Sequence, residues 1–132
     1  MKPFIVLMPG MMCNQDVFSH QINALEKFFN VIVIEFNEHR DIELGVRNLA
    51  SNLPNQFHLL GHSMGGIVAM ELVKQHSKRV LSLALLNTNP YEEKEEVKDR
   101  RNKILKELDL SLIHISEPTR PLYISYAVFC LK

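Results

Sequence analysis

The sequence predicts an α/β fold, built as a parallel sheet of about four strands with helices on both faces. Short runs that are apolar at successive positions alternate with longer segments in which apolar residues recur every three or four positions. Strands that are apolar on both faces are typical of a parallel sheet covered by helices on each side. A glycine-rich stretch, residues 61–66, separates one such run from the helical segment that follows it.

The expected elements follow one another in regular alternation. The runs that predict strands are Phe4–Met8, Val31–Phe36, Phe57–Leu60 and Val80–Leu86. The segments that predict helices are residues 16–28, 42–53, 64–76 and 91–108. We expect the four strands to lie in the spatial order 2-1-3-4 with right-handed crossovers, which brings the carboxyl ends of the first and third strands to one crevice.

The helix boundaries are predicted from capping residues and prolines. Asp16 is a candidate N-cap, Pro54 ends the second helix, and Asn89 with Pro90 begins the last one. The buried side of the first helix is expected to consist of Val17, Ile22, Leu25 and Phe28.

Composition narrows the class of protein. The 132 residues are 46% apolar and carry a formal net charge of zero, which is typical of one soluble globular domain and implies neither nucleic acid nor an anionic membrane as a partner. No run of 18 apolar residues predicts a spanning helix, and the opening residues lack a signal-peptide cleavage site. Cys13 and Cys130 form no disulfide framework, which favours the cytoplasm. A lipid anchor at Cys13 is disfavoured because methionines, not small residues, precede it.

The stretch around Ser63 has the pattern of a nucleophile elbow. Gly61, Ser63 and Gly65 fit GxSxG between a predicted strand and a predicted helix. Such a Ser occupies a strained turn, and the glycines admit neighbouring backbone. The N–H of Met64, at the start of the helix, is a candidate oxyanion donor. The alternative is a glycine-rich turn with no catalytic role, and a phosphate-binding loop is disfavoured because no Lys follows the glycines.

Four stretches together resemble the α/β-hydrolase superfamily, and in particular its small esterase-like and lactonase-like members. In order they are FIVLMPGMMCNQDVF, VIVIEF, HLLGHSMGGIVAMEL and RVLSLALLNTNP, and the resemblance covers residues 3 to about 108. It implies that the N–H of Met11 is the second oxyanion donor and that His62, which precedes the nucleophile, is a packing and orienting residue. The alternative for His62 is a catalytic base. Pro9 stands where many members have His.

The resemblance also implies a triad in the order Ser, then Asp or Glu, then His. After Ser63 the chain has only His76 and His114. His76 lies about 20 Å of helix beyond Ser63, at a rise of about 1.5 Å per residue. His114 lies in a segment with a resemblance of its own. We therefore expect the triad acid and His to be absent from this chain.

The last segment, residues 110–132, resembles the translation of a transposase-based sequencing adapter. Leu110 to Arg120 match one end of such an adapter and Ile124 to Lys132 match the other, with room for a barcode between them. The alternative is a final strand, LYISYAVF, that closes the sheet. We therefore expect residues 1–109 to be a truncated hydrolase core with the start of a cap, followed by a non-native tail at 110–132. The strand Val80–Leu86 would then be an exposed edge that favours self-association.

The function predicted from these residues is that of a serine hydrolase. By the resemblance, Ser63 attacks a carboxylic ester, thioester or lactone to form an acyl-enzyme, while Met11 and Met64 hold the oxyanion. No metal or organic cofactor is needed, and the expected partner is a small ester-type substrate. Without its base, the chain as written is expected to be inactive. The alternatives are other chemistry on the same fold, such as C–C hydrolysis, dehalogenation or cofactor-free peroxidation, and a non-catalytic binding protein.

Overall fold

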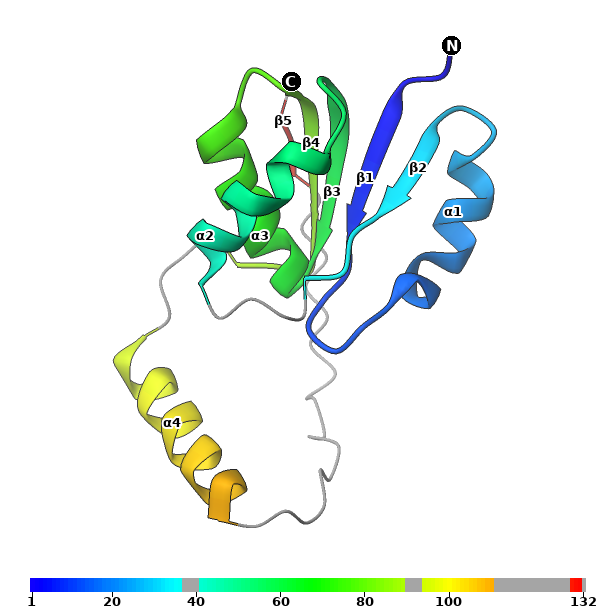
Figure 1. Cartoon of the computed structure of the whole chain (residues 1–132). Helices are drawn as coiled ribbons and strands as arrows, with labels where there is room; N and C mark the ends of the chain where they lie inside the picture. The colour runs from blue at the N-terminus through cyan, green and yellow to red at the C-terminus, as the bar shows by residue number, and fades with distance from the viewer. Residues whose placement is uncertain (37–40, 90–93, 111–128, 132) are drawn as a thin grey trace. The chain divides into compact units, whose positions relative to one another are not determined.

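The computed structural model describes residues 1–36, 41–89, 94–110 and 129–131. The chain divides into two compact units, residues 1–90 with 125–132 and residues 91–124. Within the described residues, the first unit holds the sheet and the second holds one helix, α4 (Glu95–Leu110) (Figure 1). No helix in the described part of the chain is both long and apolar enough to cross a membrane.

The sheet has five strands in the order β2-β1-β3-β4-β5. Their bounds are β1 (Phe4–Met8), β2 (Asn30–Val33), β3 (Phe57–His62), β4 (Val80–Leu86) and β5 (Phe129–Leu131). The first four strands are parallel, and their order confirms the predicted 2-1-3-4. Because Met8 of β1 pairs with Gly61 of β3, the carboxyl ends of these strands lie side by side.

The fifth strand corrects the expectation that β4 is an exposed edge. β5 runs antiparallel to β4, with Leu131 opposite Leu83 and Phe129 opposite Leu85. Unpaired N–H and C=O groups at a sheet edge can hydrogen-bond to an extended chain, and residues 129–131 occupy that position. Leu83 and Leu85 are buried, whereas Leu81, outside this pairing, is 44% exposed.

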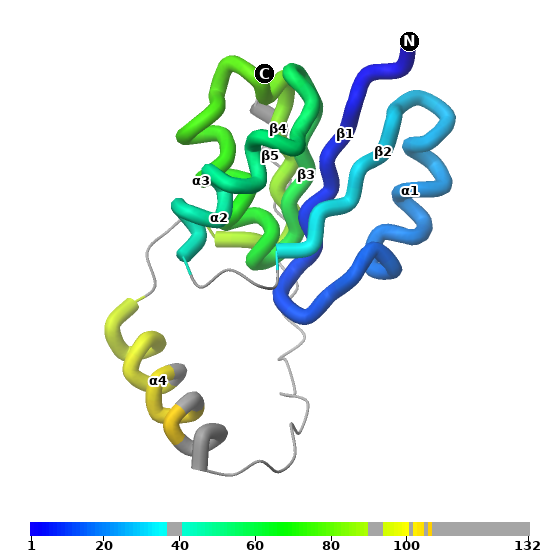
Figure 2. Tube along the Cα trace, viewed as in Figure 1, coloured from blue at the N-terminus to red at the C-terminus, as the bar shows by residue number. Residues whose placement is uncertain are grey.

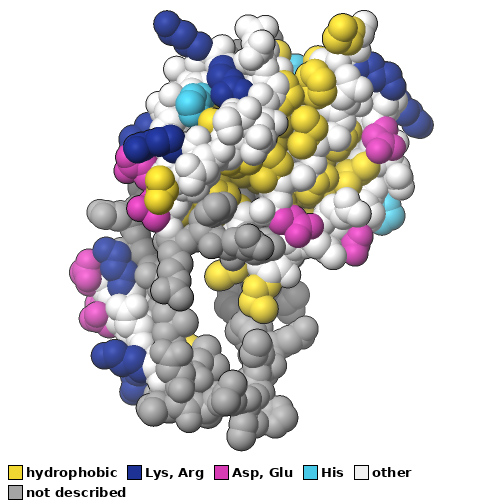
Figure 3. All heavy atoms as spheres, in the orientation of Figure 1, with side chains coloured by type: hydrophobic (Ala, Val, Ile, Leu, Met, Phe, Trp, Pro, Cys, Tyr) yellow, Lys and Arg dark blue, Asp and Glu magenta, His cyan; other side chains and the backbone are white. Residues whose placement is uncertain are grey.

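Helices cover both faces of the sheet, as predicted (Figure 2). On one face α2 (Ile42–Leu49) and α3 (Met64–His76) pack over Val6 and Met8 of β1. On the other face α1 (Ser19–Leu25) packs over Ile5 and Leu7. Alternate side chains of β1 therefore enter two separate apolar clusters, which explains why this strand is apolar at every position. In Figure 3 apolar side chains form a band across the first unit, and Phe4, Ile32 and Ile34 are half-buried at the margin of the larger cluster.

The start of the first helical segment differs from the prediction. The Asn14 side chain, not that of Asp16, accepts the capping hydrogen bond, from the N–H of Asp16 at 2.9 Å. This cap begins a 3₁₀ turn, η1 (Gln15–Phe18), ahead of α1. The tighter turn changes which side chains face the sheet, so that Phe18 is buried while Val17 and Phe28 are exposed.

The other boundaries lie close to the predicted ones. The bounds of β1, α3 and β4 agree with the prediction, while β3 runs to His62 and β2 ends at Val33. The Asp41 carboxylate caps α2 by accepting the N–H of Leu44 at 3.1 Å, and a 3₁₀ turn, η2 (Ala50–Asn52), follows the helix. The predicted start of the last helix at Pro90 lies outside the described residues.

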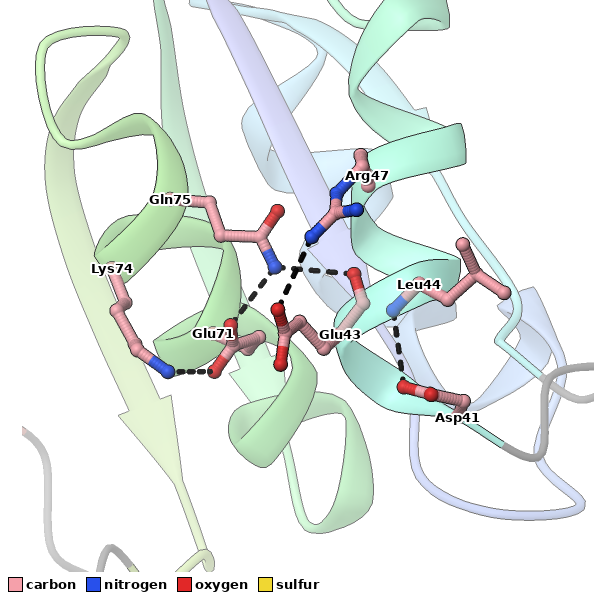
Figure 4. Close-up of polar contacts among 7 residues, drawn as sticks. All are labelled: Asp41, Glu43, Leu44, Arg47, Glu71, Lys74 and Gln75. Atoms are coloured by element: carbon pink, nitrogen blue, oxygen red, sulfur yellow. Dashed lines mark hydrogen bonds and ion pairs between the residues drawn. The ribbon is translucent and has the colours of Figure 1, made fainter.

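Polar contacts on the surface join α2 to α3 (Figure 4). The Gln75 amide donates to the carbonyl oxygen of Glu43 at 3.1 Å and to the Glu71 carboxylate at 2.9 Å. The bond from Gln75, helped by Lys74, lowers the pKa of the half-buried Glu71 below its ordinary value. These contacts fix the position of α3, whose first residues form the elbow.

Arg79 joins the segment after α2 to the start of β4. Its guanidinium donates to the carbonyl oxygens of Ala50, Leu53 and Pro54 at 2.9, 2.7 and 2.8 Å. It also lies 5.9 Å from the centre of the Phe57 ring. Charged donors therefore satisfy carbonyl groups at the end of a helical segment, where they lack partners within the helix.

Candidate active site

Ser63 lies between the last residue of β3 and the first residue of α3, in a conformation that L-residues rarely adopt. Its φ is 53° and its ψ is −121°. Outside glycine, such a conformation costs about 1 to 3 kcal/mol and persists only where the surrounding structure imposes it. The Ser63 side chain makes no capping hydrogen bond to α3 within the described structure. The conformation is therefore imposed by backbone contacts.

Close backbone packing holds the elbow against the end of β1. A Cβ on Gly65 would collide with the carbonyl oxygen of Met8 and would lie 2.5 Å from that of Pro9. A Cβ on Gly61 would lie 2.6 Å from the carbonyl oxygen of Gly65. Both glycines of the GxSxG pattern therefore occupy positions where no side chain fits without movement of the backbone.

The end of β4 holds the elbow from the other side. The N–H of Ser63 donates to the carbonyl oxygen of Leu86 at 2.9 Å. The carbonyl oxygen of Ser63 accepts from the Thr88 hydroxyl at 2.7 Å and from the N–H of Gly66 at 2.9 Å. Hydrogen bonds thus fix the peptide groups on both sides of the Ser63 Cα atom.

The loop after β1 reaches the same crevice. A Cβ on Gly10 would lie 3.2 Å from the Cβ of Ser63. The N–H of Cys13 donates back to the carbonyl oxygen of Gly10 at 3.1 Å, which closes a turn around Met11 and Met12. Met12 has a φ of 58°, and the side chains of Met11 and Met12 are 66% and 80% exposed. The loop that carries Met11 therefore begins against the candidate nucleophile and has exposed apolar side chains at Met11 and Met12.

His62, within the GxSxG pattern, and His76, at the end of α3, have different surroundings. The His62 ring packs edge-on against Phe18, with ring centroids 6.4 Å apart and an interplanar angle of 85°. His76 is the last residue of α3, at the opposite end of the helix from Ser63, and its buried Nε2 has no hydrogen-bond partner within the described structure. His114 lies outside the described residues. The described residues contain no group of three or more His, Cys, Asp or Glu able to hold a metal ion.

The sequence analysis missed the contribution of residues 86–88. Val80–Leu86 was predicted as a strand and Asn89 as the start of the last helix, with no role for Asn87 and Thr88 between them. In the structure Asn87 has a φ of 47°, so that Met12, Ser63 and Asn87 are non-glycine residues with positive φ after β1, β3 and β4. A signal was present in the sequence, because Thr88 lies just past the carboxyl end of a strand predicted to neighbour β3. Strained residues are thus found together past the carboxyl ends of the parallel strands, as they are at many functional sites.

Comparison of the sequence with models of known protein families identifies the family of this chain. A model of the alpha/beta hydrolase fold matches residues 39–120. The chain belongs to the α/β-hydrolase family. Residues 110–120 of the matched range are also part of the adapter-like segment.

The curated relatives of this α/β-hydrolase are esterases. The chain is 30% identical over 98 residues to the pimeloyl-[acyl-carrier protein] methyl ester esterase of Aeromonas hydrophila, covering 67% of this chain and 39% of the relative. It is 28% identical over 96 residues to the Vibrio atlanticus protein of the same name, covering 67% of this chain and 37% of the relative. The chain therefore spans well under half the length of these relatives.

Solved structures share the fold of this α/β-hydrolase. A carboxylesterase structure from Nitrososphaera gargenis superposes with a TM-score of 0.70 at 19% identity, covering 94% of this chain and 54% of that one. A thermophilic esterase from Thermogutta terrifontis gives a TM-score of 0.66 at 21% identity, covering 81% and 46%. At these identities the likeness concerns the fold alone.

Proposed function

We propose that the protein is a serine hydrolase that cleaves a carboxylic ester, thioester or lactone through an acyl-enzyme on Ser63. The observation that carries this proposal is the conformation of Ser63, whose φ of 53° is held between the end of β1 and the end of β4. A glycine-rich turn with only a structural role has no need of a Ser in such a strained position. The family match and the esterase relatives support the same reaction class.

The proposed reaction assigns roles to Ser63, to two backbone N–H groups and to a His. Ser63 Oγ attacks the carbonyl carbon of the substrate and gives its proton to a His that acts as general base. The substrate oxygen becomes an oxyanion, which accepts hydrogen bonds from the N–H groups of Met64 and Met11. The N–H of Met64 belongs to the first residue of α3, and the first N–H groups of a helix have no partner within the helix. The leaving alcohol takes the proton from the His, and water then hydrolyses the acyl-enzyme.

The substrate class is narrowed by the relatives and by the loop after β1. The curated relatives are named for a methyl ester on an acyl chain carried by acyl carrier protein. Met11 and Met12 have exposed apolar side chains, in the loop that begins at Gly10 against Ser63. An ester of a small alcohol with an apolar acyl chain is therefore the first substrate class to test.

The triad acid and His are proposed to lie outside this chain. The chain spans 39% of the length of its Aeromonas relative, and His76 is at the far end of α3 from Ser63. We assign residues 1–109 to a truncated core and residues 110–132 to a non-native tail that resembles an adapter. The 132-residue chain is then expected to show little or no turnover, because a Ser hydroxyl needs an adjacent base to attack efficiently.

The test compares rates of p-nitrophenyl acetate hydrolysis. The 132-residue chain, the full-length protein containing residues 1–109, and its Ser63→Ala and Ser51→Ala variants are measured. Ser51 is an exposed control whose hydroxyl bonds only to the carbonyl oxygen of Asn48 among the described contacts. We expect turnover by the full-length protein and its Ser51→Ala variant, and loss of turnover with Ser63→Ala.

Two results would contradict the proposal. If Ser63→Ala leaves the full-length rate unchanged, Ser63 is not the nucleophile. If the 132-residue chain matches the full-length protein, a base for Ser63 lies within this chain. A full-length protein inactive on esters directs the search to other chemistry on the same fold.

A further inference from the structure

The carbonyl oxygen of Ser63 accepts two hydrogen bonds from different parts of the fold. The Thr88 hydroxyl, beyond the end of β4, donates at 2.7 Å. The N–H of Gly66, in the first turn of α3, donates at 2.9 Å. A carbonyl oxygen has two lone pairs, so both are occupied.

This carbonyl belongs to the same peptide group as the N–H of Met64. A trans peptide group is planar, and its C=O and N–H bonds point in opposite directions. Fixing the Ser63 oxygen therefore fixes the direction of the Met64 N–H. The ψ of Ser63, −121°, sets the rotation of this peptide plane, and the two bonds to its oxygen oppose any change in that angle.

Thr88 is itself held in place by close packing. A Cβ on Gly66 would lie 2.6 Å from the Cβ, Cγ2 and Oγ1 atoms of Thr88. Thr88 follows Asn87, whose φ is 47°, and Leu86 just before them accepts the N–H of Ser63. The threonine is half-buried, and its side chain rests directly on the backbone of α3.

We propose that Thr88 is a positioning residue that aims the Met64 N–H at the oxyanion of the transition state. Its hydroxyl also polarises the peptide group to which it donates, which strengthens the N–H as a donor. This role rests on the proposed serine-hydrolase function. It assigns to the residues after β4 a part in the reaction that the sequence analysis did not foresee.

The test uses the full-length protein with Thr88→Val, Thr88→Ser and Ser63→Ala. Val keeps the shape of Thr and removes the hydroxyl, whereas Ser keeps the hydroxyl. Complete loss of an oxyanion donor lowers kcat roughly a hundredfold to a thousandfold, so a donor that is misaligned is expected to cost about tenfold. We expect Thr88→Val to lower kcat on p-nitrophenyl acetate by that amount with KM unchanged, and Thr88→Ser to restore it. Thr88→Ala removes the same hydroxyl and replaces the Val variant if that one does not fold.

A spectroscopic measurement on the 132-residue chain accompanies the kinetics. The amide proton shift of Met64 is expected to change with Thr88→Val and to stay near that of the unmodified chain with Thr88→Ser. Unchanged kcat in Thr88→Val overturns the inference, and so does an equal loss in Thr88→Val and Thr88→Ser. A Ser63→Ala variant that keeps full activity overturns the proposed function instead, which separates the two failures.

Discussion

Replacing Gly65 with Ala adds a methyl group where the backbone at the end of β1 already lies. The new Cβ would collide with the Met8 carbonyl and lie 2.5 Å from the Pro9 carbonyl oxygen, whereas real Cβ contacts essentially never fall below 3.0 Å. Relief of the Pro9 contact alone requires a movement of at least about 0.5 Å between α3 and the residues at the end of β1. Inserting a methyl group into a packed core costs about 1 to 3 kcal/mol, and two backbone groups that cannot rotate away favour the upper end of that range.

Urea unfolding followed by circular dichroism measures this cost. Gly65→Ala is compared with Gly10→Ala, in which the added Cβ would lie 3.2 Å from the Ser63 side chain, a tight contact that small shifts relieve. We expect a loss of about 3 kcal/mol in unfolding free energy for Gly65→Ala and less than about 1 kcal/mol for Gly10→Ala. A Gly65→Ala protein that unfolds at the same urea concentration as the unmodified chain would refute the close approach of α3 to β1.

Three further predictions follow from the contacts described above. Arg79→Met removes charged donors to three carbonyl oxygens and is expected to lower the free energy of unfolding in urea by about 2 to 4 kcal/mol. The control is Arg47→Met, which breaks an exposed ion pair and is expected to lower the same free energy by less than about 0.5 kcal/mol. Removal of residues 111–132 takes β5 from the edge of β4 and is expected to cause self-association in sedimentation velocity, whereas a monodisperse monomer would contradict this. Gly66→Ala displaces Thr88 and is expected to lower the full-length kcat about as much as Thr88→Val, roughly tenfold, while a wild-type rate would count against the positioning role.

The sequence predicted those parts of the fold that depend on apolar pattern. β1, α3 and β4 have the predicted bounds because each is a continuous apolar or periodic run with a clear stop. The predicted start of the first helix was wrong because the Asn14 side chain caps a 3₁₀ turn, η1, ahead of α1. A final strand that closes the sheet was only the alternative interpretation of LYISYAVF, because the pairing of β5 with β4 depends on an edge far away in the chain and not on local pattern.

In the candidate site, too, the features with a local sequence pattern were predicted and those that depend on distant contacts were not. The GxSxG pattern predicted that Ser63 lies at a strand-to-helix turn, because small residues at fixed spacing are a local signal. The role of Thr88 depends on a contact across 25 positions of the chain, and a single hydroxyl after a strand carries little information of that kind. A sequence pattern therefore does not predict side chains, such as that of Thr88, that contact the site from a distant position in the chain.

The contacts around Ser63 also set the order in which the elbow can form during synthesis. Its strained turn is held by Met8 and Pro9, which leave the ribosome before it, and by Leu86 and Thr88, which leave after it. Until β4 docks, the hydrogen bonds that join Ser63 to Leu86 and Thr88 cannot form, so part of what offsets the roughly 1 to 3 kcal/mol of backbone strain is missing. The strained turn at Ser63 is therefore completed only when the end of β4 docks.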